Sequence, residues 1–172
     1  MDVKPNSLRI VHYPAPSLRA ATVPVPEVDD NVRAVAGRML KLMHEGDGVG
    51  LAAPQVGLDW RMFVTNGREA DPVDRVFINP RLKLENGPIV AMEEGCLSLP
   101  GIHVEVRRAP SAVVTAQNLD GEEFVLEAED FLARICQHEY DHLEATLIID
   151  KMTPMDRLAT RKAIKELEAT AR

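Results

Sequence analysis

The chain has 172 residues, 45% of them hydrophobic and 27% charged, which is enough length and apolar content for a packed core. A count of 20 Lys and Arg against 27 Asp and Glu gives a net charge of -7, which argues against a protein that mainly binds duplex DNA or an anionic membrane. No apolar stretch approaches the about 18 residues of a membrane span, and the start of the chain lacks a signal-peptide core, so we expect a cytoplasmic protein.

Five prolines in the first thirty residues predict an irregular segment there, because proline interrupts a helix. Apolar residues then recur at spacings of three and four, which predicts a helix over 28–45 that ends at Gly46. Short β-branched runs follow and predict antiparallel strands, with a turn at 119–122 before the last one. The predicted strands are residues 61–65, 75–78, 87–92, 102–106, 112–117 and 124–126.

Two further helices are predicted after the strands. The first covers about 128–144 and has Glu129 and Asp130 in its first turn, where negative charge suits the helix dipole. The second covers 154 to about 169, with Thr153 as N-cap and Pro154 at the first helical position. Without repeats or linkers, we expect residues 1–172 to form a single α+β domain. Antiparallel sheets would pack around the helix at 128–144, with one helix before them and one after.

The strongest local signal is the sequence HEYDH at 138–142, which matches the pattern HExxH. On a helix, His138 and His142 differ by about 40° in direction, so both imidazoles can reach one metal ion. Glu139 points close enough to face a water on that ion without binding the ion itself. A catalytic site needs a third protein ligand from elsewhere in the chain.

The spacing of the remaining candidates does not identify that third ligand. Cys136 lies two residues before His138, about 200° around the helix, so we expect it to be a buried core residue. Cys96 follows a strand and stands beside Gly95, although a lone cysteine is more often structural. The other candidates are His12, His44 and His103, each better explained by an ordinary surface or capping role, and the carboxylates.

Three segments together carry a family resemblance. GVGLAAPQ at 48–55, EGCLS at 94–98 and HEYDH at 138–142 resemble, in order and separation, the signature motifs of peptide deformylases. The resemblance covers most of the chain and implies that Cys96, His138 and His142 bind a divalent metal ion. In that family the ion is usually Fe²⁺, with Zn²⁺, Ni²⁺ or Co²⁺ as substitutes, and a thiolate with two imidazoles suits several of these ions.

The same resemblance implies a reaction: removal of the formyl group from the N-formylmethionine of nascent peptides, with release of formate. A bound ion would lower the pKa of a water, and Glu139 would take the proton and later deliver it to the departing amine. By resemblance, the side-chain amide of Gln55 and the backbone N–H of Leu97 stabilise the oxyanion. Gly50 would form a main-chain hydrogen bond to the peptide.

Methionine specificity requires an apolar pocket beside the metal. The positions that resemble the family's pocket are Val49, Met92, Phe131 and Ile135. Helical spacing equally allows Phe131 and Ile135 to be plain core residues. We also expect Arg108 to pair with Glu94, or else to form an ordinary surface pair. One departure from the family pattern is Ala145, which stands where the family commonly has glycine.

Residues 151–172 contain six basic and three acidic side chains, a charge of +3, against -10 for residues 1–150. A basic helix on an acidic protein is suited to docking on ribosomal RNA, as the family's C-terminal helix is thought to do; a solvated amphipathic helix is the alternative.

Two other functions of the protein remain as alternatives to deformylation. A general HExxH metallopeptidase is disfavoured by a thiolate ligand, which weakens Lewis acidity, and a non-catalytic binding module would need neither Glu139 nor Gln55.

Overall fold

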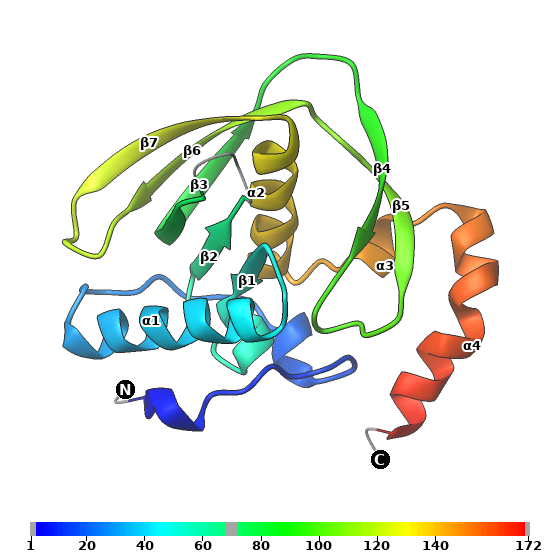
Figure 1. The fold of residues 1–172 in the computed structure, drawn as a ribbon, viewed down its shortest axis with the longest axis horizontal. Coiled ribbons are helices and arrows are strands. Elements are labelled where there is room, and N and C mark those ends of the chain that lie inside the picture. The colour runs from blue at the N-terminus through cyan, green and yellow to red at the C-terminus, as the bar shows by residue number, and fades with distance from the viewer. Residues whose placement is uncertain (1–2, 68–71, 171–172) are drawn as a thin grey trace.

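The computed structural model describes residues 3–67 and 72–170 (Figure 1). The proline-rich start is irregular, as predicted, apart from two short 3-10 helices, η1 (Pro5–Ser7) and η2 (Pro16–Arg19). Helix α1 (Asp30–Glu45) follows and begins two residues later than the periodicity suggests. The Asp29 carboxylate accepts a hydrogen bond from the backbone N–H of Val32 at 2.8 Å, so Asp29 is the N-cap.

The strands form two antiparallel sheets. The larger has the order β1-β2-β3-β6-β7, and the smaller is the pair β4-β5. All six predicted strands are present, and β1 is an addition that the sequence pattern did not reveal. The bounds are β1 (Gly50–Ala52), β2 (Met62–Asn66), β3 (Asp74–Leu84), β4 (Val90–Gly95), β5 (His103–Arg108), β6 (Ser111–Gln117) and β7 (Glu123–Glu129).

Helix α2 (Asp130–Leu143) lies between the five-stranded sheet and the β4-β5 pair (Figure 1). The expected start at residue 128 is wrong, because Ala128 still pairs with Ala112 in the sheet and β7 runs directly into the helix. A short helix, α3 (Ile148–Lys151), was not predicted. Helix α4 (Pro154–Thr170) begins where expected: the Thr153 hydroxyl accepts a hydrogen bond from the backbone N–H of Asp156 at 3.1 Å.

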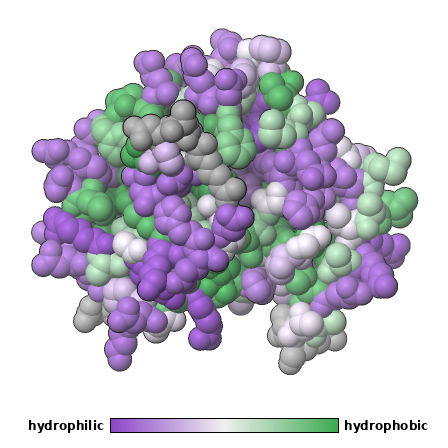
Figure 2. All heavy atoms as spheres, in the orientation of Figure 1, coloured by the Kyte–Doolittle hydropathy of each residue, from purple (hydrophilic) through white to green (hydrophobic). Residues whose placement is uncertain are grey.

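Three clusters of buried side chains hold these elements together. One lies between α1 and the β1-β2 edge, and another lies beneath β5, α3 and α4. The third joins α2 to the large sheet and includes Phe63, Phe77 and Cys136, with the two rings stacked at 4.6 Å. This confirms that Cys136 is a core residue. The face seen in Figure 2 is largely hydrophilic, with apolar side chains between the polar ones. None of the helices in the described residues is long and apolar enough to cross a membrane.

The end of α2 carries a Schellman motif, in which two backbone N–H groups bond back to the last helical carbonyls. Thr146 donates to Asp141 at 2.9 Å, and Ala145 donates to His142 at 3.2 Å. Ala145 has φ 53°, in the left-handed region that favours glycine. Ala145 therefore stands at the position where the helix ends.

Candidate metal centre

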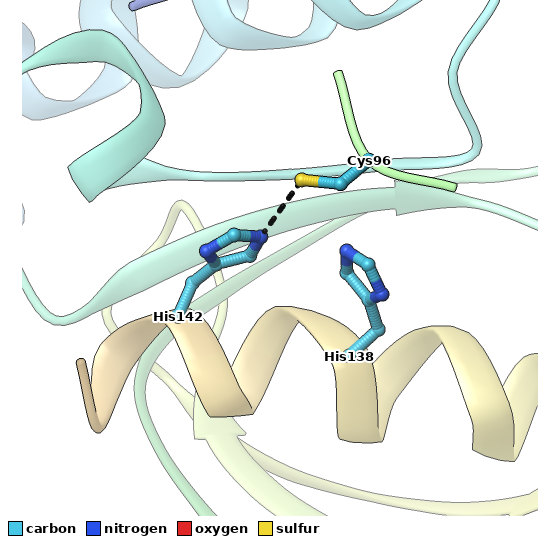
Figure 3. A group of neighbouring side chains, drawn as sticks. All are labelled: Cys96, His138 and His142. Atoms are coloured by element: carbon cyan, nitrogen blue, oxygen red, sulfur yellow. Dashed lines mark hydrogen bonds between the residues drawn. The ribbon is translucent and has the colours of Figure 1, made fainter. Parts of the chain in front are cut away.

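Three side chains with metal-binding atoms converge where α2 faces the loop after β4 (Figure 3). The ligand atoms of Cys96, His138 and His142 all lie within 4.8 Å of one another. The Sγ of Cys96 is 3.4 Å from Nε2 of His142, and the two imidazole rings are 5.1 Å apart. The structure thus brings together the two histidines of the helix and the cysteine that spacing alone could not choose. Neither Cys136 nor any of the other three histidines joins this group.

A buried carboxylate fixes the orientation of one of the two imidazoles. Glu94 accepts hydrogen bonds from Arg108 at 2.6 and 2.8 Å and lies 3.0 Å from Nδ1 of His138, which leaves Nε2 of that ring for a metal. Burial alone would raise the pKa of Glu94, but the hydrogen bonds from Arg108 and His138 outweigh it and hold the pKa well below its usual range. The predicted Arg108–Glu94 pair is confirmed.

Arg134 is part of this network and was missed in the sequence. Its Nη1 donates to Glu94 at 2.7 Å and to the carbonyl of Val106 at 3.0 Å, and its Nη2 donates to the carbonyl of Val90 at 2.7 Å. The guanidinium therefore ties α2 to both strands of the small sheet. A signal was available, because Arg134 and His138 are four residues apart and share one face of the helix.

Glu139 lies against the backbone of β1. A Cβ placed on Gly50 would lie 2.7 Å from Cδ of Glu139, so only glycine leaves room for the carboxylate. Glu139 is 3% exposed, and burial raises its pKa to about 7. A carboxyl group with such a pKa can both accept and return a proton near neutral pH. Burial lowers the pKa of His142, which favours the neutral imidazole that binds metals.

Gln55 is buried on a short 3-10 helix, η3 (Ala53–Val56), directly after β1. Its Oε1 accepts a hydrogen bond from the backbone N–H of Ala52 at 2.8 Å. Its Nε2 lies 3.4 Å from Sγ of Cys96 and 3.3 Å from the hydroxyl of Ser98, a buried residue that the sequence did not single out. The side-chain amide therefore presents its donor end to the metal centre.

Leu97 follows Cys96 and packs toward α1. A Cβ placed on Gly48 would lie 2.7 Å from Cδ1 of Leu97, so the glycine makes space for this side chain. The packing holds the backbone of the Cys96 loop next to the segment that carries Gly50.

A cavity of about 490 Å³ opens at the centre. Four of the predicted substrate-binding residues line it: Val49, Gly50, Phe131 and Ile135. The lining does not include Met92, which is 44% exposed on β4. Ile135 is 3% exposed and Phe131 45%, so Ile135 lies deep and Phe131 near the opening. His103, expected to have an ordinary surface role, also lines the cavity, where its ring lies beside Gly95.

Comparison with known proteins agrees with this geometry. The family model described as polypeptide deformylase matches residues 7–158. The chain is 42% identical over 164 residues to a peptide deformylase of Thermotoga sp., covering 95% of this chain and 98% of that protein. It is 40% identical over 163 residues to peptide deformylase 1B, chloroplastic/mitochondrial, of Arabidopsis thaliana, covering 94% of this chain but only 60% of the plant protein.

Solved structures show the same likeness. A plant peptide deformylase crystal structure matches with a TM-score of 0.92 at 39% identity, covering 99% of this chain and 94% of that one. Peptide deformylase from Thermotoga maritima matches with a TM-score of 0.80 at 42% identity, covering 86% of this chain and 98% of that one. The α+β architecture expected from the sequence is the one these structures have.

Proposed function

The chain belongs to the polypeptide deformylase family, and on that premise we propose which of its residues bind the metal, move the proton and hold the substrate. Membership makes the protein a hydrolase that removes the formyl group from N-formylmethionyl peptides. The assignments below concern how this chain performs that reaction. The observation that carries them is the convergence of Cys96, His138 and His142 beside the buried Glu139.

Cys96, His138 and His142 hold the metal ion in this proposal, and Fe²⁺ is the ion we assign. One thiolate and two imidazoles form a three-ligand set that leaves a further coordination position open, and this set also accepts Zn²⁺, Ni²⁺ or Co²⁺. In His138 the Nδ1 atom is hydrogen-bonded to Glu94, and in His142 the Nδ1 atom is buried. In both rings the Nε2 atom is therefore the one left to bind the ion. When bound, such an ion polarises the formyl carbonyl and lowers the pKa of a water so that hydroxide forms near neutral pH.

Glu139 is assigned to proton transfer. Its carboxylate takes the proton from the attacking water and returns it to the nitrogen of the departing peptide, so that a neutral amine leaves. Three observations support this assignment: the carboxylate lines the cavity, it lies on the backbone of Gly50, and burial raises its pKa to about 7. A group that ionises near the working pH moves a proton in both directions most readily.

Gln55 and Leu97 are assigned to the oxyanion that forms on the formyl oxygen. The Gln55 amide is held at Oε1 by Ala52, so its Nε2–H groups are oriented before the substrate arrives. The backbone N–H of Leu97 belongs to the loop that follows the cysteine ligand. Donors fixed in advance stabilise developing charge without reorganising, which is why their placement matters more than their number.

The substrate peptide lies along β1 in this proposal. Strand β1 ends the five-stranded sheet, so the backbone of Gly50 on its outer side is available to an extended peptide. The methionine side chain enters the cavity between Val49, Ile135 and Phe131. These three apolar side chains accept the thioether and disfavour a charged side chain at that position.

The experiment compares anaerobically purified protein, loaded with Fe²⁺ or Ni²⁺, on formyl-Met-Ala and acetyl-Met-Ala peptides. We expect formate release from the formyl peptide, little hydrolysis of the acetyl peptide, and a loss of at least about 10²-fold in kcat for Glu139→Gln. Glu127→Gln, an exposed change on β7, is the matched control and keeps the rate. Cleavage of internal peptide bonds, or a Glu139→Gln variant as fast as the parent, would refute the assignment.

We further propose that the basic face of α4 docks on the ribosome. The helix packs inward through Ala163, Ile164 and Leu167, which leaves Arg161, Lys162 and Lys165 exposed. Reversing these three charges to glutamate should abolish salt-sensitive cosedimentation with ribosomes, because phosphate contacts dominate such binding. Cosedimentation equal to that of the parent protein at low salt would contradict the proposal.

We also propose that the protein works in the cytoplasm, a reducing compartment in which its two free thiols stay reduced.

A further inference from the structure

Thr65 is a fully buried polar residue in the middle of β2. Its side chain has no exposed surface, and its Oγ1 has no hydrogen-bond partner among the residues that the structure describes. A buried hydroxyl without a partner destabilises the fold, so it calls for an explanation. Glu139 presents the same problem, since its Oε2 is also buried and unpartnered within the described ranges.

The sheet register places these two orphaned groups side by side. Gly50 on β1 pairs directly with Thr65 on β2. Opposite residues of an antiparallel pair project from the same face, with Cβ atoms about 4.5–5.5 Å apart. The Glu139 carboxylate occupies the position where a Gly50 side chain would stand. The side chain of Thr65 therefore lies on the same face of the sheet as the carboxylate of Glu139, next to it.

The face of β2 supports this placement. Phe63, two residues before Thr65 and therefore on the same face, packs in the cluster that includes Ala133 and Cys136 of α2. Thr65 consequently faces the same helix that carries Glu139. On its other side Thr65 pairs with Arg75 of β3, which has interactions of its own.

Cys136 is the competing donor for Oε2 of Glu139, because it lies one turn earlier on the same helix. A thiol S–H is a weak hydrogen-bond donor. The threonine O–H is the stronger donor, and a carboxylate oxygen is among the strongest acceptors. The better-matched pair is Thr65 with Glu139.

We propose that Thr65 is a positioning residue for proton transfer: its hydroxyl holds Oε2 of Glu139 across one bridging water and thereby leaves Oε1 to the reacting groups. The proposal rests on the role given to Glu139 above. A carboxylate held at one oxygen cannot rotate away from the substrate, whereas an unheld one must be fixed at each turnover. Thr65 itself touches neither metal nor substrate.

The test uses three variants in the formate-release assay with the metal-loaded enzyme. Thr65→Val keeps the shape of the side chain and removes the hydroxyl; Thr65→Ser keeps the hydroxyl. Thr115→Val is the matched control, because Thr115 lies on the opposite face of the same sheet from the buried Val114 and Ala116. We expect about a 10-fold fall in kcat with unchanged KM for Thr65→Val, and rates within about 2-fold of the parent for the other two.

A purely structural threonine gives a different pattern. Replacing an unpaired buried hydroxyl with a methyl group would then raise stability and leave kcat as it was, and that result would overturn the proposal. Equal losses of kcat in Thr65→Val and Thr65→Ser would overturn it as well, because the hydroxyl would not be the cause. A double-mutant cycle with Glu139→Asp adds a check: the two effects should be less than additive, and full additivity would refute the coupling.

These outcomes are separable from failure of the proposed function. If Glu139→Gln is inactive while Thr65→Val is fully active, only the role of Thr65 falls. If Glu139→Gln is as active as the parent, the assignment of Glu139 falls, and the role of Thr65 falls with it.

Discussion

Ala145 offers a substitution whose effect on stability has the opposite sign from the usual one. The residue has φ 53° and occupies the position after the C-cap of α2, where its N–H and that of Thr146 close the Schellman motif. We predict that Ala145→Gly stabilises the protein. The two backbone hydrogen bonds do not involve the side chain and should persist in the variant.

The magnitude follows from two opposing terms. A left-handed conformation costs an L-residue with a Cβ about 1–2 kcal/mol, and glycine does not bear this cost. Glycine loses more backbone entropy on folding, which offsets about 0.5–1 kcal/mol. The net gain is about 0.5–1 kcal/mol, and for a chain of this length it corresponds to a rise of about 1–4 °C in Tm. Ala145 is only partly buried, so loss of its methyl group changes little else.

Urea unfolding and thermal unfolding of Ala145→Gly would measure this difference. Ala159→Gly is the matched control, because Ala159 is exposed in the interior of α4 and lies outside the catalytic centre. There the same substitution should destabilise by about 1 kcal/mol. A loss of stability in Ala145→Gly, as in the control, would refute the reasoning, since it would mean that the backbone strain at Ala145 is not relieved.

Three further predictions concern other parts of the molecule. In metal-free native protein a thiol reagent should modify Cys96 and spare Cys136, whose side chain is fully buried with its pKa raised to about 12; mass spectrometry showing equal modification would contradict this. Burial alone would raise the pKa of Asp150, but the hydrogen bond from Arg19 outweighs it and lowers the pKa. The ion pair therefore stabilises the fold above about pH 4, and this stabilisation is lost as the pH falls through the lowered pKa. Asp150→Asn should therefore lose less unfolding free energy than the parent between about pH 5 and pH 2, and parallel stability curves would rule that out. Thr153→Ala should lower the urea-derived unfolding free energy by about 1 kcal/mol through loss of the α4 N-cap, whereas Thr153→Ser should lower it much less; similar losses in both would argue against a capping role.

Sequence patterns predicted correctly those features that depend only on residues close together in the chain. The histidines of HEYDH share one helix face whatever surrounds them, and the position of Cys136 on the opposite side followed from the same angles. The start of α4 was correct because Thr153 and Pro154 carry their own capping signal. These features need only neighbours in sequence.

Other features depend on contacts that spacing does not encode. The spacing of residues left the candidates for the third ligand open, and the fold brings Cys96 beside both histidines by placing the loop after β4 over α2. Strand β1 has only three residues, all of them buried, and shows no alternation, so its pairing with β2 defines it. The same pairing places Thr65 beside Glu139, a relation between residues 74 positions apart that no sequence window contains.

The separation between Cys96 and His142 also has a consequence for the unfolded chain. These two residues are 46 positions apart, and a metal ion bound to both would close a loop of that length. If the ion stayed on both residues in the unfolded chain, the chain-entropy relation used for disulfides puts the conformational freedom lost there at about 4 kcal/mol. The metal centre would then act as a reversible cross-link between the loop after β4 and α2. A chelator that removes the ion would therefore lower the stability of the fold as well as abolish catalysis.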